Sequence, residues 1–99
     1  MPVATRGDLN REHALLSTTY TLTVPGLVEA SEHTTLQGAI DALAQVIRST
    51  PIRRDRADAF LWLIAAEGGP DRVLDFIQRD GRFQLTFIAA GRRYTAVIR

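Results

Sequence analysis

Within residues 18–24, polar and apolar types alternate one by one from Thr19 onward. Threonines separate three positions that would face inward, Tyr20, Leu22 and Val24. This two-residue period predicts a strand with one buried face. Pro25 and Gly26 follow and are typical of a turn. Residues 27–31 repeat the alternation only weakly, so we expect no more than a short return strand there.

From residue 34 the period lengthens to that of a helix. Apolar residues recur every three or four positions and would share one face: Leu36, Ala39, Ile40, Leu43, Val46 and Ile47. The pattern predicts an amphipathic helix over 34–48 that lies on an apolar surface. Thr34 and Gln37 are spaced as in a capping box. Pro51 ends the helix, because the residue before a proline disfavours helical backbone angles.

Two further helices are expected over 51–67 and 70–80. The helix 51–67 is charged in its first half and apolar nearly all round in its second half. One apolar stripe consists of Ala57, Phe60, Leu61 and Ile64. The opposite stripe consists of Ala59, Trp62, Leu63 and Ala66. Gly68 and Gly69 separate the two helices, and Gly81 is suited to end the last one.

The C-terminal residues alternate on both sides of a turn around Ala90, which predicts a hairpin of strands over 82–89 and 92–98. Pairing Phe87 with Tyr94 makes one face entirely apolar, whereas a slip of one residue would mix the two faces. Two strands alone are marginally stable, so we expect the first strand to complete the sheet.

Together these elements predict one α+β domain over 15–99. Its antiparallel sheet of three to four strands would carry the three helices on one face. Residues 1–14 follow neither period, and we expect them to form a flexible N-terminal arm. Charged residues interrupt every apolar stretch of the N-terminus, which argues against a signal peptide. The longest apolar run, 59–66, is too short to span a membrane, so we expect a cytoplasmic protein with no membrane partner.

The composition adds two constraints. The 99 residues contain no cysteine, which excludes disulfides, thiolate zinc sites and cysteine nucleophiles. The net charge of +1 argues against strong non-specific binding to nucleic acid. All twelve basic residues are arginine and none is lysine, alongside thirteen alanines and one asparagine. This bias indicates the GC-rich genome of a bacterium or of its phage; a functional avoidance of lysine is the alternative.

No motif gathers residues for catalysis or metal binding. His13 and His33 have no second histidine one helical turn away, so we expect no metal site. No serine lies in a glycine-flanked elbow, and Gly68 and Gly69 are not followed by the lysine and hydroxyl of a phosphate-binding loop. We therefore expect no enzyme activity and no cofactor, although carboxylates could still pair in space.

The arginines support an alternative hypothesis. Three helices followed by a strand, a basic turn and a second strand resemble the order of elements in a winged helix-turn-helix, over about two thirds of the chain and without a specific motif. The resemblance implies that the helix 70–80 lies in the major groove of DNA. The residues in contact with nucleic acid would be Arg72, Arg79, Arg92 and Arg93. Asp71 and Asp75 on the same helix argue against DNA, as does the small net charge.

The stripe around Trp62 is the favoured candidate for function. Its residues are Ala59, Trp62, Leu63 and Ala66. Either the helix 51–67 is central and buries both of its stripes, or this stripe contacts a second copy of the chain or another protein. Small residues permit close approach, and tryptophan is frequent in binding hot spots. We expect a small non-enzymatic interaction or regulatory protein that acts through protein contacts as a homodimer.

Overall fold

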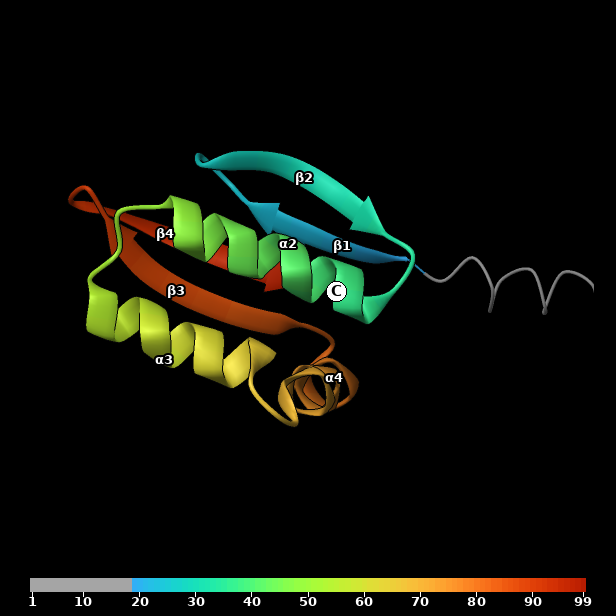
Figure 1. Cartoon of the computed structure of the whole chain (residues 1–99). Coiled ribbons are helices and arrows are strands. Elements are labelled where there is room, and N and C mark those ends of the chain that lie inside the picture. The colour runs from blue at the N-terminus through green and yellow to red at the C-terminus, as the bar shows by residue number, and fades with distance from the viewer. Residues whose placement is uncertain (1–18) are drawn as a thin grey trace, which may run out of the picture.

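The structure, a computed structural model, describes residues 19–99 (Figure 1). Within this range it has an α+β fold, with four antiparallel strands in one sheet and three helices. The elements are β1 (Tyr20–Val24), β2 (Val28–His33), α2 (Leu36–Ser49), α3 (Arg54–Ala65), α4 (Gly69–Asp80), β3 (Phe83–Ala89) and β4 (Arg92–Ile98). The predicted fold class is therefore confirmed. The arm expected over 1–14 lies outside the described residues.

The sheet has the strand order β2-β1-β4-β3, so the first strand lies beside the last one and completes the sheet as expected. The hairpin register is also the one expected from the apolar face, with Phe87 opposite Tyr94. Its turn has only two residues, Ala90 and Gly91, whose φ angles are 52° and 77°. Two consecutive positive φ angles are those of a type I′ turn, which suits the twist of an antiparallel hairpin.

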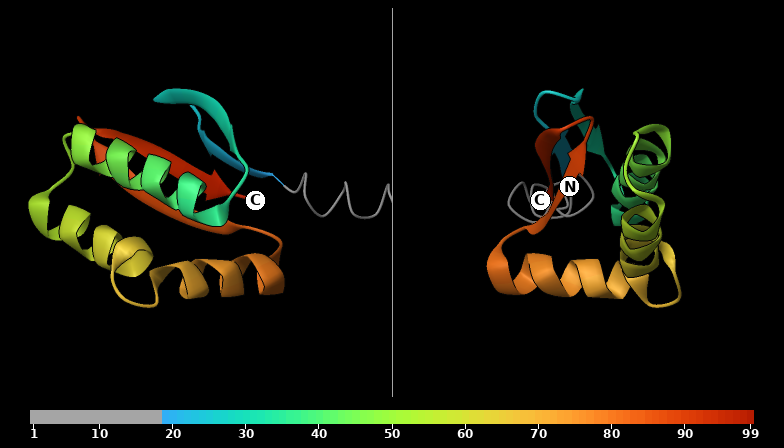
Figure 2. Two further views of the ribbon diagram at one scale, coloured as in Figure 1. Left: turned by 45° about the vertical axis from the view of Figure 1, so that its right-hand side comes forward. Right: turned by 90° about the vertical axis from the view of Figure 1, so that its left-hand side faces the viewer.

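The core lies between one face of the sheet and α2. Five residues of α2 are buried there: Ala39, Ile40, Leu43, Ala44 and Ile47. The buried residues of the sheet alternate along each strand, as Phe83, Leu85, Phe87 and Ala89 do in β3. Both α3 and α4 flank this core, and α4 crosses below the β3 side of the sheet (Figure 2). Phe76 of α4 meets Phe83 edge-on there, with ring centroids 5.6 Å apart.

The helix boundaries differ from the expected ones for local reasons. The N-cap of α2 is Thr35 rather than Thr34, because the extended backbone of Thr35 lets its Oγ1 accept a hydrogen bond from the N–H of Gly38 at 3.0 Å. The expected capping box is therefore wrong, and Gln37 donates instead to Asp41 one turn later. The second helix begins at Arg54 rather than at 51, after an extended connection.

Candidate functional site

The helix α3 packs against the core with one face only. Ile64 is fully buried, and Phe60 and Leu61 are partly buried beside it. On the opposite face Ala59 is exposed, and 62% of the surface of Trp62 remains accessible. The hypothesis of a central helix buried on both sides is therefore wrong for this chain. The physical reason is that α3 lies at the flank of α2, so no second layer formed by residues 19–99 covers its outer side (Figure 2).

The stripe predicted from the sequence keeps its exposed character only in part. We call it the Trp62 surface: Ala59, Trp62, Leu63 and Ala66. Leu63 and Ala66 are partly buried, and Ala66 ends the helix as its C-cap. The accessible centre of the surface is thus one large aromatic ring next to the small side chain of Ala59. Such a ring is typical of a residue that a partner covers.

The side chain of Arg72 joins α4 to the end of α3. Its guanidinium donates hydrogen bonds to the backbone oxygens of Trp62 at 2.9 Å, Leu63 at 3.0 Å and Glu67 at 3.0 Å. The carbonyl of Trp62 also accepts the N–H of Ala66 at 3.3 Å, and carbonyls near a helix end otherwise lack intrahelical partners. The guanidinium carbon also lies 4.5 Å from the centroid of the Trp62 ring. One side chain therefore caps α3 and holds its exposed tryptophan by a cation–π contact.

The four arginines of the DNA hypothesis lie in two separate places. Arg72 is engaged at the end of α3, and Arg79 is close to Asp75 and Asp80, at 3.7 and 3.6 Å. Arg92 and Arg93 are exposed beside the β3–β4 turn. The seven residues of β3 separate that turn from α4 (Figure 1), a distance of about 20 Å along an extended strand. The fold therefore does not gather the four side chains into one cluster.

One of the two histidines, His33, lies in the described part of the chain. His33 shares a hydrogen bond of 2.8 Å with Ser31 on β2, and His13 lies outside the described residues. Within 19–99 no group of three or more histidine or carboxylate side chains is placed to hold a metal ion. None of the helices described there has both the length and the apolar character needed to cross a bilayer.

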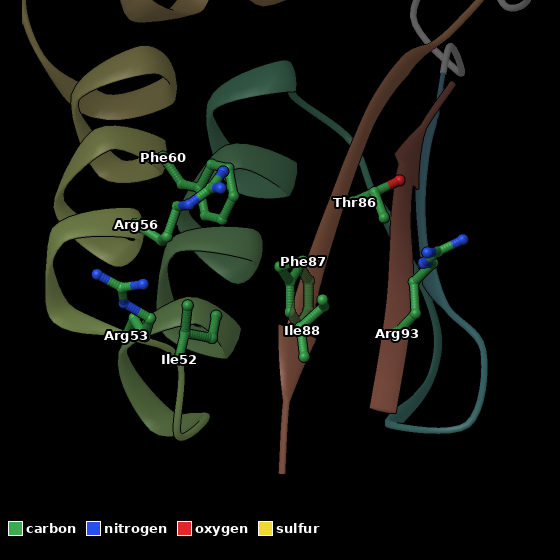
Figure 3. A pocket seen from close by; sticks show the side chains of 8 residues that line it. All are labelled: Ile52, Arg53, Arg56, Phe60, Thr86, Phe87, Ile88 and Arg93. Carbon is green, nitrogen blue, oxygen red and sulfur yellow. The ribbon is translucent and has the colours of Figure 1, made fainter. Parts of the chain in front are cut away.

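A groove lies between the beginning of α3 and the strand β3. We call it the β3 groove, and its volume is about 470 Å³. Eight residues line it: Ile52, Arg53, Arg56, Phe60, Thr86, Phe87, Ile88 and Arg93. Arg56 and Phe60 reach from α3 toward the strand, and Thr86 and Arg93 lie on the other side of β3 (Figure 3). The sequence pattern does not reveal this groove, because it brings together residues about forty positions apart.

No family model, no curated protein and no solved structure matches this chain. Its function is therefore inferred from the placement of its own residues.

Proposed function

We propose that this chain is a non-enzymatic interaction protein that acts through protein–protein contacts and pairs with a second copy through the Trp62 surface. The observation that carries the proposal is the accessibility of Trp62, which is 62% exposed although the ring is held in place. Removing a large aromatic side chain from water is favourable, and an exposed one therefore gains stability when a partner covers it.

The contact with Arg72 prepares Trp62 for such a partner. Association normally restricts the side chains of the interface, at a cost of about 0.5–1.5 kcal/mol for each flexible one. The guanidinium of Arg72 already lies against one side of the ring and is itself fixed by three backbone oxygens. Trp62 therefore loses little further freedom on binding, as expected of an anchor residue.

A second copy fits the Trp62 surface in shape. When two α3 helices pack antiparallel about a two-fold axis, the small Ala59 of one copy lies near the ring of Trp62 of the other. The same arrangement brings the beginning of each helix to the end of its mate, so the opposed helix dipoles favour it.

Light scattering after size exclusion tests the proposal directly. We expect the wild-type protein to have twice the mass of one chain at micromolar concentration, and Trp62→Ala to be a folded monomer with an unchanged far-UV spectrum. Trp62 is the only tryptophan, so its emission should shift to longer wavelength on dilution as the pair dissociates. Ile88→Ala, which shortens another exposed apolar side chain on a different face, is the matched control and should leave the mass unchanged.

A second variant tests the contact of Ala59 with the ring of Trp62. Ala59→Glu would place a carboxylate of each copy against the ring of the other, so it should give a folded monomer. Wild-type protein that is monomeric at all concentrations would contradict the proposal. Trp62→Ala protein that is unfolded would contradict the assignment of Trp62 to a surface rather than to the core.

The proposal also covers the source of the protein and its location in the cell. We place the protein, encoded by a GC-rich bacterium or by its phage, in the bacterial cytoplasm, and the lysine-free composition supports the GC-rich source. A regulatory role through a protein partner suits a small chain without a recognisable catalytic motif. Detection of the native protein in a soluble cell fraction would test this part.

A further inference from the structure

The two edges of the sheet differ in how they are protected against another strand. The edge strand β2 carries Glu29 and Glu32, and its register with β1 shifts between Leu22 and Val24. Charges and bulges of this kind hinder the pairing of an edge with a foreign strand. The edge strand β3 has neither a charged residue nor a proline, and it pairs with β4 over seven residues without a shift.

The backbone direction of β3 follows from its neighbours. Alternate residues of an antiparallel strand direct their N–H and C=O groups to opposite sides. Arg99, which follows β4, exchanges both of its backbone bonds with Thr21 of β1, at 2.8 and 3.1 Å. Counting back from Arg99 in steps of two from its neighbour, the residues of β4 whose N–H and C=O groups point toward β3 are Ile98, Ala96, Tyr94 and Arg92. Arg92 lies opposite Ala89, and these two residues close a two-residue turn as a hydrogen-bonded pair should.

Every second residue of β3 therefore directs its backbone groups away from the sheet. These residues are Gln84, Thr86 and Ile88. Within residues 19–99, β3 is an edge strand that pairs with β4 alone, and none of these three residues makes a backbone hydrogen bond in a turn, loop or cap. Thr86 and Ile88 line the β3 groove, so their free N–H and C=O groups lie along it. This open edge can accept the backbone of an extended chain.

The groove also offers an apolar surface on each side of the strand. On the helix side Phe60 and Phe87 lie with ring centroids 6.4 Å apart, and Ile52 lines the groove with them. On the other side Ile88 has 61% of its surface exposed. A strand laid along β3 would direct alternate side chains to these two surfaces.

The charge around the groove has one sign. Three of its eight lining residues are arginines and none is acidic. Arg53 is paired with Asp55 at 3.2 Å, in an exposed contact. Arg56 and Arg93 have no ion-pair partner among residues 19–99. Both guanidinium groups are therefore available to a negatively charged segment.

We propose that the open edge of β3 binds an extended acidic segment of another protein, which adds to the sheet as a further strand at Thr86 and Ile88. Such β-strand addition takes its affinity from backbone hydrogen bonds and its specificity from alternate side chains. Here the apolar side chains of the segment would pack against Phe60 and Ile52, which are partly buried. The acidic ones would lie near Arg93 on the opposite side, or reach Arg56 at the rim.

A second copy of the chain fits this edge poorly. Pairing β3 with its own copy would place two sets of groove arginines against each other, which is repulsive. Nucleic acid also fits poorly, because Phe87 is buried and Phe60 is partly buried, so neither offers an open stacking surface. The proposal does not depend on self-association through the Trp62 surface, since different side chains carry the two contacts.

A labelled peptide of nine residues that alternates glutamate and valine, with both ends blocked, is the probe. Fluorescence anisotropy should show saturable binding that weakens with added salt, because exposed charges are screened. The same peptide with lysine in place of glutamate should bind at least about tenfold more weakly, a difference of about 1.4 kcal/mol. Binding should slow the hydrogen exchange of the Thr86 and Ile88 amides.

Two variants separate the backbone and charge contributions. Thr86→Pro removes an N–H that points outward and leaves the β3–β4 hydrogen bonds in place, a position where an edge strand tolerates proline. It should stay folded and lose about tenfold in peptide affinity. Arg93→Glu should cause a similar loss. Arg99→Glu makes the same charge change at an exposed site away from the groove and should bind as the wild type does.

The results of these experiments distinguish the molecules that could bind the edge of β3. Equal binding of the glutamate and lysine peptides, or undiminished binding by folded Thr86→Pro protein, would overturn the proposal, as would no binding at all. Displacement of the peptide by single-stranded DNA at lower concentration would assign the groove to nucleic acid instead. A lower mass of Thr86→Pro protein in light scattering would assign the edge to a second copy. Peptide binding by monomeric Trp62→Ala protein would support this proposal while leaving self-association to its own test.

Discussion

Arg72 contacts both the backbone and the ring of Trp62. The Nη2 atom of Arg72 donates to the carbonyl oxygen of Trp62 at 2.9 Å, and the guanidinium carbon lies 4.5 Å from the ring centroid. The planar guanidinium can make both contacts because its donors lie at its edge while its face is free to stack. The exposed side of α3 is thereby tied to the first turn of α4.

Replacement of Arg72 should therefore destabilise the fold. We expect Arg72→Met to lower the free energy of unfolding by about 2 kcal/mol, since hydrogen bonds from charged donors contribute about 1.5–3 kcal/mol and three carbonyls lose theirs together. Urea denaturation would measure the loss. Arg72→Lys should recover little, because an ammonium group cannot reproduce the fork. Arg79→Met is the matched control, and its exposed ion pairs should contribute less than about 1 kcal/mol.

The start of α2 provides a prediction that separates two adjacent threonines. Thr35→Ala should lower stability by about 1 kcal/mol, because it removes the hydroxyl that accepts the N–H of Gly38. Thr34→Ala should have almost no effect, since Thr34 is exposed and is not the cap. Thermal unfolding of the two variants would compare them. A larger effect at Thr34 would restore the capping box with Gln37.

Strand pairing could be predicted from the sequence because polar and apolar residues alternate along each strand. A slip of one residue would put Phe83, Leu85 and Phe87 on the opposite face from their apolar partners, and the structure has the register that keeps them together. The helix starts were less predictable, because Thr34 and Thr35 are equally suited to capping and backbone geometry decides between them. The sequence pattern of α2 therefore predicted its apolar face better than its first residue.

The candidate site depended on information that periodicity does not contain. The helical period of the α3 sequence predicts two apolar stripes, but only the packing of α3 beside α2 determines which stripe is buried. The role of Arg72 requires the turn at Gly68, whose φ of 78° directs α4 back toward the end of α3. The β3 groove joins Arg56 to Arg93, and no local pattern connects residues so far apart.

The separation of the basic residues leads to a prediction about DNA. Arg72 is engaged by carbonyls, and Arg92 and Arg93 lie at the far end of β3 from α4. We expect micromolar protein to leave the electrophoretic mobility of random duplex DNA unchanged at low salt, where non-specific binding is strongest. A shift that Arg92→Gln with Arg93→Gln abolishes would favour the winged-helix hypothesis. Arg99→Gln, which also removes an exposed charge, would serve as its control.

The turn of the hairpin is not at its optimum for stability. Ala90 has a φ of 52°, a left-handed conformation that disfavours a Cβ atom. Asparagine at the first position and glycine at the second are preferred in a type I′ turn. We expect Ala90→Asn to raise the free energy of unfolding by about 0.5–1 kcal/mol. Gly91→Ala should lower it by a similar amount because its φ is 77°, and the opposite signs in one turn would confirm the turn type.

Amide hydrogen exchange of the free protein should reveal the open edge of β3 residue by residue. The amides of Leu85 and Phe87 donate to β4, so we expect them to exchange only when the core opens. The amides of Thr86 and Ile88 point away from the sheet and should exchange much faster, although they lie in the same strand. Two-dimensional NMR during exchange would separate the four signals. Uniform protection along β3 would show that another part of the chain or a second copy already covers this edge, which would remove the basis for strand addition. Fast exchange confined to alternate residues would instead identify the N–H groups that a partner segment can bind.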